Sequence, residues 1–268
     1  MKKLVWVLMV WGLALAVAGP TWACTIFEVS GTATHYFASN EDWSATDPAM
    51  RVEPGDGKHY GYIVFGWEAY LPGYPQGGVN EHGVCLDWAS LTPQPFRNDP
   101  GKKTLDEDIF YKILKQCQTV AEAIRLVGQY NCPHLAEEHL LVADRSGASC
   151  IIEWSERGYA FIRKDRNYQV ITNFSVVNPK VGWYPCERFQ TVDRELRTRP
   201  KEEVDLAAVT ELLRRTHQEG QYQTIYSYIV DARSLDIYVF YRHDFSKYVK
   251  YNFAREVRKG RHQVKLYP

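Results

Sequence analysis

Cys24 is the residue whose position in this sequence is most suited to chemistry. It follows Thr21-Trp22-Ala23, which meets the preference of a signal peptidase for small residues one and three positions before its cut. Cleavage after Ala23 would make Cys24 the first residue of the mature chain. Such a residue carries both a thiol and a free α-amine, so the nucleophile would have its own base.

The segment before Cys24 has the pattern of a secretory signal, with Lys2 and Lys3 ahead of an almost purely apolar run over 4–18. This run is shorter than the ~20 residues of a membrane-spanning helix, and Pro20 follows it. An uncleaved anchor and a lipoprotein are the alternatives, although a lipoprotein prefers an aliphatic residue where Thr21 stands. We predict a cleaved signal peptide over 1–23 and one domain over 24–268. The product would be periplasmic or secreted, without stable membrane insertion.

Other side chains could assist a Cys24 nucleophile. An α-amine has a pKa near ~7.7–8 and a thiol near ~8.5, so both titrate close to neutral pH. The amine can then accept the thiol proton, and a carboxylate such as Asp42 could orient that amine. Acyl transfer also needs neutral donors for the oxyanion, for which an amide side chain is suitable. Asn173 ends a predicted strand and Asn80 begins a predicted turn, so either could supply such a donor.

The predicted elements around these residues are mostly strands. Apolar alternation predicts a strand over 24–29 and a second over 35–38, which would bring Asp42 back toward Cys24. The stretch 78–88 reads as a strand, a tight turn at 81–83 and a strand. Further strands are expected at 59–67, 139–143, 149–154, 159–163, 168–174, 222–231, 235–242 and 248–253.

Four helices interrupt the strands in two pairs. Thr104 with Glu107, and Thr119 with Glu122, have the spacing of capping boxes before apolar residues at helical spacing. A third helix is expected over 186–196 and a fourth over 205–216, with Asp205 as its N-cap. Strands and helices segregated into blocks predict an α+β fold with antiparallel sheets. Two sheets packed face to face between helix layers, a four-layer αββα sandwich, would use every element.

The composition excludes some classes of function. The whole chain has 32 basic and 32 acidic side chains, and loss of Lys2 and Lys3 leaves the mature chain at −2. Nothing in this balance attracts nucleic acid. The six cysteines and eight histidines show no spacing typical of a metal site, so we expect no metal and no cofactor. Cys117 with Cys132 is the one disulfide considered, and the oligomeric state, a homo-oligomer included, stays open.

Five motifs in order give the chain a resemblance to a known family. They are Cys24-Thr25, Asn40-Glu41-Asp42-Trp43, Gly78-Val79-Asn80-Glu81-His82-Gly83, Thr172-Asn173 and Glu187-Arg188-Phe189. With them the chain resembles the N-terminal nucleophile hydrolases of the choloylglycine hydrolase family of linear amide C–N hydrolases. That group includes penicillin V acylase, acid ceramidase and acyl-CoA:isopenicillin acyltransferases.

The resemblance implies a role for each candidate residue. Cys24 would be the nucleophile, and Asp42 would contact it. The hairpin at Asn80 would help shape the oxyanion hole, and Asn173 would donate to the oxyanion. Arg188 would belong to the polar network around the cysteine. No cofactor is implied, and the partner is a small N-acyl amide.

One position departs from that pattern. The bile salt and penicillin V enzymes of the family carry an arginine three residues before the aspartate, where this chain has Ser39. Bile salts, penicillin V and ceramide are therefore doubtful as specific substrates. We predict an exported hydrolase that cleaves a linear amide through a thioester. The alternatives are an acyltransferase or peptidase with the same nucleophile, or a non-catalytic binding protein.

Overall fold

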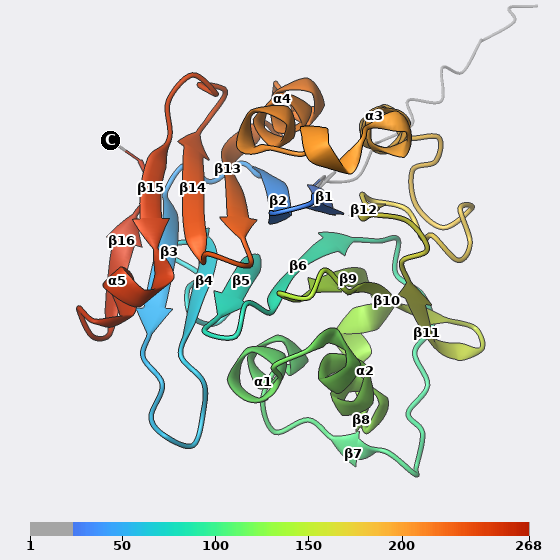
Figure 1. Cartoon of the computed structure of the whole chain (residues 1–268). Coiled ribbons are helices and arrows are strands. Elements are labelled where there is room, and N and C mark those ends of the chain that lie inside the picture. The colour runs from blue at the N-terminus through green and yellow to red at the C-terminus, as the bar shows by residue number, and fades with distance from the viewer. Residues whose placement is uncertain (1–23, 268) are drawn as a thin grey trace, which may run out of the picture.

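Two antiparallel sheets packed face to face form the centre of the protein (Figure 1). The computed structural model describes residues 24–267, so the predicted signal peptide lies outside the described residues. In the part that is described, no helix is long and apolar enough to cross a membrane.

The first sheet has six strands and contains the residue that the sequence singles out. Its order is β12 (Tyr168–Ile171), β1 (Thr25–Ser30), β2 (His35–Asp42), β13 (Thr224–Asp231), β14 (Asp236–Tyr241) and β15 (Val249–Asn252). In β1 and β2, Thr25 pairs with Asn40 and Ile26 with Ser39. The predicted hairpin is therefore confirmed, and it returns the end of β2 to the start of β1.

The second sheet has eight strands. Its order is β11 (Gly158–Arg163), β10 (Ser149–Ser155), β9 (Glu138–Ala143), β6 (Cys85–Ser90), β5 (Gly77–Asn80), β4 (Tyr62–Trp67), β3 (Pro48–Glu53) and β16 (His262–Lys265). A separate parallel pair joins β7 (Lys103–Thr104) to β8 (Tyr130–Asn131). Strand β3 was not predicted, because turn signals lie at both of its ends and its charged residues mask the alternation.

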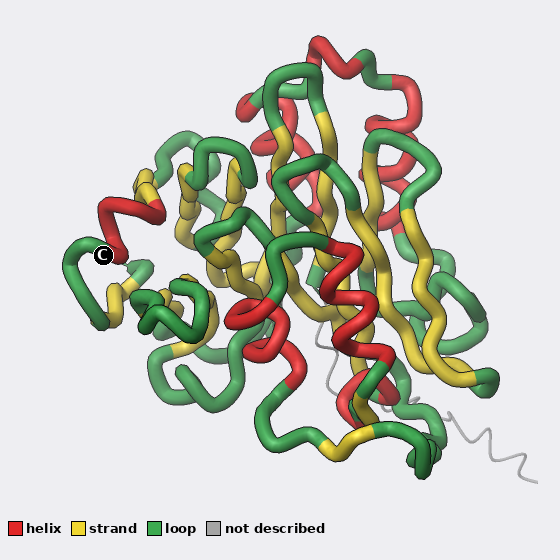
Figure 2. Tube along the Cα trace, turned by 60° about the horizontal axis from the view of Figure 1, so that its bottom comes forward, coloured by secondary structure: helices red, strands yellow, loops and turns green. Residues whose placement is uncertain are grey.

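Helices cover the outer face of each sheet. They are α1 (Ile109–Gln116), α2 (Val120–Gly128), α3 (Glu187–Thr198), α4 (Leu206–Thr216) and the short α5 (Phe253–Val257), with 3-10 turns at Pro133–Ala136 and Lys201–Glu203. One apolar cluster joins α1 and α2 to the eight-stranded sheet, and another joins α3 and α4 to the six-stranded sheet. Figure 2 shows α1 and α2 in front of the strands. The predicted four-layer αββα sandwich is confirmed.

Two local predictions are wrong. Thr104 does not cap α1, because it lies in β7 and the nearer Asp108 accepts the Phe110 N–H at 2.9 Å instead. At the second predicted capping box only the N-cap half is confirmed: the Thr119 hydroxyl accepts the Glu122 N–H at 3.2 Å, but the Glu122 carboxylate accepts the N–H of Gln118 instead of that of Thr119. The Cys117–Cys132 disulfide is also wrong, because both thiols are free.

Asn80 fastens the β5–β6 hairpin to helix α1. Its side-chain amide donates to the carbonyls of Leu114 at 2.9 Å and Cys117 at 2.8 Å. Its side-chain oxygen accepts the N–H groups of His82 and Val84, each at 3.0 Å. These hydrogen bonds satisfy the polar groups of the buried Asn80 side chain, which therefore holds the β5–β6 hairpin of the sheet to the helix layer.

Asn80→Ala should lower the free energy of unfolding by about 2–4 kcal/mol, since two carbonyls and two N–H groups lose their partner in the interior. Urea denaturation followed by circular dichroism would measure this. As a control, Asn252→Ala removes a cap from the short helix α5, and it should cost only about 1 kcal/mol. Equal losses from the two substitutions would contradict the assignment of Asn80 as the residue that holds the hairpin to the helix layer.

Candidate active site

Alternation along β1 and β2 sends neighbouring side chains to opposite faces of the six-stranded sheet. Cys24 and Ile26 belong to the apolar cluster between the sheets, whereas Phe27 packs toward α3 and α4. On β2, Phe37 faces the space between the sheets and Ala38 faces the helices. The same period places Glu41 on the Cys24 side and Asp42 on the helix side.

Arg188, near the start of α3, holds the backbone of Cys24. Its Nη1 donates to the Cys24 carbonyl at 2.7 Å and to the Thr25 hydroxyl at 2.8 Å. Its Nη2 donates to the Asn173 side-chain oxygen at 3.1 Å. Nη1 also lies 3.8 Å from Asp42 Oδ2. One guanidinium therefore connects the candidate nucleophile, the candidate oxyanion donor and the candidate orienting carboxylate.

Asp42 is buried and held by two residues of the segment that follows α4. The Gln218 side-chain amide donates to Oδ2 at 2.7 Å, and the Thr224 hydroxyl donates to Oδ1. Burial raises the pKa of Asp42 to about 8, against the opposing effects of Arg188, Thr224 and Gln218. Burial disfavours the ionised Asp42 carboxylate, and the positive charge and hydrogen-bond donors of its neighbours oppose that effect.

Asn173 follows β12 and lies beside the end of β6. Its amide nitrogen donates to the Ser90 carbonyl at 3.1 Å, while its oxygen accepts from Arg188. Gly182 has φ +102, and a Cβ there would come within 2.3 Å of the Asn173 carbonyl. The segment after β12 therefore packs at a distance that only glycine allows, which fixes the position of Asn173.

The structure does not bring Asn80 to this site. Val79 faces the cluster between the sheets, whereas Gly78 lies against Leu114 of α1, and Asn80 points to the same side as Gly78. The nearby backbone is also occupied, because the Glu81 N–H donates to Gly61 and the Asn80 N–H to Val84. The predicted contribution of this hairpin to an oxyanion hole is therefore corrected. The end of β6, at Ser90, is the part of that hairpin that reaches Asn173.

A buried pair of carboxyl groups faces the Cys24 thiol, and sequence reasoning missed it. The Cys24 thiol donates to Glu41 Oε2 at 3.6 Å, and Ser39, in the position of the expected arginine, donates to Glu41 Oε1 at 2.5 Å. The Glu41 carboxyl is hydrogen-bonded to that of Asp87. Asp87 Oδ2 accepts from the Tyr228 hydroxyl.

The two carboxyl groups oppose each other's ionisation. Burial raises the pKa of Glu41, and burial together with the charge of Glu41 raises that of Asp87. The negative charge of one buried carboxylate disfavours ionisation of another beside it, so the neutral form of each group is favoured. Gly77 makes room for this pair, because a Cβ there would lie 2.6 Å from Asp87 Oδ2. The sequence offered one signal for it, an acidic residue at the inward-facing position 41.

This environment keeps the Cys24 side chain in its thiol form. Burial raises the pKa of Cys24 well above its usual value, and the charges of Glu41, Asp42 and Asp87 raise it further. Cys24 is only 6% exposed. Arg188 donates to the backbone carbonyl of Cys24. A thiol in such a place attacks as its proton leaves, so it needs a base within reach.

The chain matches known proteins at the level of family and fold. The family described as acyl-coenzyme A:6-aminopenicillanic acid acyl-transferase matches residues 29–239. No curated protein has a matching sequence.

Solved structures share the fold at low identity. A mutant of the conjugated bile acid hydrolase from Clostridium perfringens is 13% identical, with a TM-score of 0.68 over 91% of this chain and 97% of that one. Penicillin V acylase from Agrobacterium tumefaciens is 18% identical, with a TM-score of 0.64 over 81% and 83%. The N-acylethanolamine-hydrolyzing acid amidase ortholog of Caenorhabditis elegans is 12% identical, with a TM-score of 0.58 over 78% and 93%.

These likenesses, together with the αββα layers, confirm the resemblance to N-terminal nucleophile hydrolases. The chain therefore belongs to the acyl-coenzyme A:6-aminopenicillanic acid acyl-transferase family.

Proposed function

We propose that the exported, mature protein begins at Cys24 and hydrolyses a linear amide bond of an N-acyl substrate. The observation that carries the proposal is the guanidinium of Arg188, which joins the Cys24 carbonyl, the Thr25 hydroxyl and the Asn173 side chain. This holds a residue at the start of a strand beside an amide donor. Such fixed geometry is what an attacking nucleophile needs.

The reaction would proceed in two steps. The Cys24 sulfur attacks the carbonyl carbon of the amide while the α-amine of Cys24 accepts the thiol proton. The oxyanion of the tetrahedral intermediate takes a hydrogen bond from the Asn173 amide. The C–N bond then breaks as the protonated α-amine gives its proton to the leaving amine. Water attacks the resulting thioester, releases the acid and restores the thiol.

Asp42 would orient the α-amine. The carboxyl is fixed by Gln218 and Thr224 and lies on the face of the sheet opposite the Cys24 side chain. Once the α-amine of Cys24 has accepted the thiol proton, it would supply positive charge beside a carboxyl whose pKa burial raises to about 8. The ionised form of Asp42 would then be favoured in the mature enzyme.

Acyl transfer is the second candidate, because the matching family is described as an acyl-transferase. The thioester is common to both reactions, and only the acceptor differs. Supplying an acyl-coenzyme A donor with 6-aminopenicillanic acid as the acceptor, and measuring acylated product against free acid, would separate transfer from hydrolysis.

The mature protein should have the mass of residues 24–268, and brief incubation with an activated N-acyl amide should add the mass of one acyl group. Intact mass spectrometry after an acid quench would show both. Cys24→Ala should lack the acyl adduct and release no amine. Cys85→Ala, which removes a buried thiol elsewhere in the same core, should retain both. A mature chain that keeps residues before Cys24 would contradict the mechanism.

Arg188→Lys should lower kcat about 10–100-fold with a smaller change in KM, because an ammonium cannot reach the Cys24 carbonyl and Asn173 together. Steady-state kinetics on the same amide would measure this. Arg166→Lys serves as the control, since Arg166 contacts Tyr168 and Asp193 at the surface and should leave kcat unchanged. Equal kcat values for Arg188→Lys and wild type would remove the guanidinium from the mechanism.

The double substitution Glu41→Gln and Asp87→Asn should lower the pKa of the Cys24 thiol by about one to three units, since it removes the negative charge that faces the sulfur. The rate of iodoacetamide alkylation as a function of pH would measure it. Glu28→Gln removes a buried carboxyl bonded to Ser149 and Lys164, away from the sulfur, and should not shift the profile. An unchanged profile in the double variant would show that the pair does not set the thiol pKa.

A further inference from the structure

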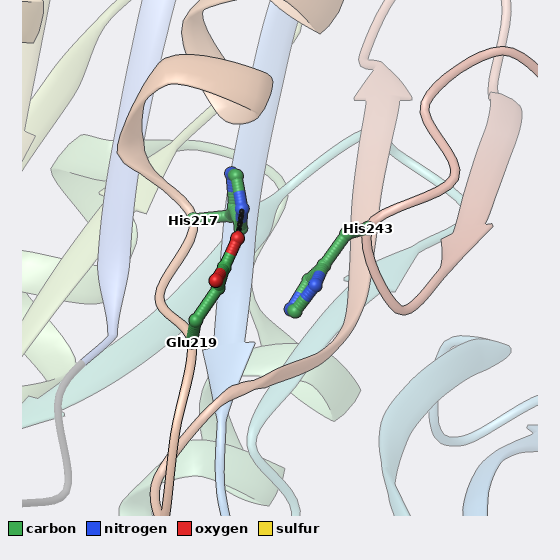
Figure 3. Close-up of side chains that lie close together, drawn as sticks. All are labelled: His217, Glu219 and His243. Carbon is green, nitrogen blue, oxygen red and sulfur yellow. Dashed lines mark hydrogen bonds and ion pairs between the residues drawn. The ribbon is translucent and has the colours of Figure 1, made fainter.

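Three potential metal ligands converge where the chain leaves α4. His217 and Glu219 follow that helix, and His243 follows β14, so two distant segments contribute (Figure 3). One ligand atom from each side chain lies within 4.8 Å of the other two. Within residues 24–267, no other three His, Cys, Asp or Glu side chains come together in this way.

The His217 ring is oriented so that its Nε2, which faces Glu219, can serve as a metal ligand. Its Nδ1 lies 2.5 Å from the Arg214 carbonyl, which can only accept, so Nδ1 carries the proton. The neutral ring then has its lone pair on Nε2. Imidazoles that bind metals are commonly held in this way, by a carbonyl on the other nitrogen.

The spacing between His217 and Glu219 already suits a tetrahedral ion. Zinc bonds of about 2.1 Å to nitrogen and oxygen place two ligand atoms roughly 3.4 Å apart. His217 Nε2 lies 3.4 Å from Glu219 Oε1. These two ligands therefore need no rearrangement to share one ion.

His243 has a buried ring nitrogen that also favours an ion at this cluster. Its Nε2 is buried and has no hydrogen-bond partner among the described residues. The ring lies with its centroid 4.5 Å from that of His217. A buried ring nitrogen without a partner is costly, and a shared ion would satisfy it.

We propose that His217, Glu219 and His243 bind Zn²⁺, with water at the fourth position. Two imidazoles and one carboxylate form a ligand set that zinc accepts readily, whereas Mg²⁺ prefers oxygen ligands. The proposal does not depend on the reaction assigned to Cys24.

The position of this site ties it to Asp42. Gln218 lies between two of the ligands, and its side chain donates to Asp42 Oδ2 at 2.7 Å. Its backbone exchanges hydrogen bonds with Thr224, whose hydroxyl donates to Asp42 Oδ1. An ion bound by residues 217, 219 and 243 would therefore stiffen the segment that fixes the Asp42 carboxyl.

Isothermal titration of ZnCl₂ into the full mature chain would test the site, in a Cys24→Ser background so that the candidate nucleophile cannot bind the ion. We expect one Zn²⁺ per chain and no heat with MgCl₂. His217→Ala, Glu219→Gln and His243→Ala should each weaken binding at least about tenfold. His59→Ala, which alters an exposed His–Asp pair outside the cluster, should bind as the parent does.

Two further measurements keep the outcome clear. Circular dichroism of each metal-free variant would confirm folding, and Glu219→Gln gives a ligand change at an exposed side chain should a histidine variant unfold. Hydrogen exchange over 217–224 should slow on adding Zn²⁺ in the parent and stay unchanged in His243→Ala. Binding that is unaffected by all three ligand substitutions, or no binding by the parent at millimolar Zn²⁺, would overturn the proposal.

Discussion

The site depends on the guanidinium of Arg188. A strand that begins at a candidate nucleophile has a backbone carbonyl at its first residue that no neighbouring strand need satisfy. Arg188 satisfies the carbonyl of Cys24, and the same group binds Thr25 and Asn173 and lies near Asp42. A planar fork of donors can make these contacts together, while a single ammonium cannot. Because Arg188 belongs to α3, the packing of α3 over β1 and β12 fixes where Cys24 lies.

The alternation of β-strands separates two tasks at this site. On the helix side of the six-stranded sheet, Asp42 and Arg188 hold the backbone of Cys24 and, in the proposed mechanism, its α-amine. Between the sheets, the Cys24 thiol donates to Glu41, and the charges of Glu41 and Asp87 raise the thiol pKa. Neighbouring residues of one strand, Glu41 and Asp42, thus act on opposite sides of the same cysteine because successive side chains point to opposite faces.

The sequence predicted the fold well wherever a pattern was local. The β1–β2 hairpin, the helix that starts after Asp205, and the block order all follow from periodicity and caps within short windows. Strand β3 was not predicted, because its charged residues obscure the strand pattern and its pairing with β4 and β16 depends on tertiary contacts.

The sequence predicted some of the residues at the site but not all of them. Cys24, Asp42, Asn173 and Arg188 lie together, as the five motifs implied. The prediction that Asn80 belongs to the site was wrong, because a turn asparagine can hydrogen-bond to its own hairpin and to a neighbouring helix instead of to a substrate. The acid pair and the histidine cluster could not be found from spacing. Glu41 is 46 positions from Asp87, and His243 is 24 positions from Glu219, so only the folded chain brings each set together.

The exchange of an arginine for Ser39 changes what the nucleophile can do. A guanidinium beside the sulfur would stabilise a thiolate before substrate arrives. Here Ser39 instead donates to Glu41, and the sulfur meets a negative pair in a buried site, which raises the thiol pKa. A resting thiolate is therefore disfavoured, and deprotonation has to accompany attack. That makes a base on the nucleophilic residue itself more important in this chain than it would be beside a cation. A thiol kept protonated is also less open to oxidation, since the thiolate is the reactive form. By keeping the thiol protonated, Glu41 and Asp87 would protect the sulfur of an exported protein from oxidation. They would also make its attack on substrate depend on the α-amine as base.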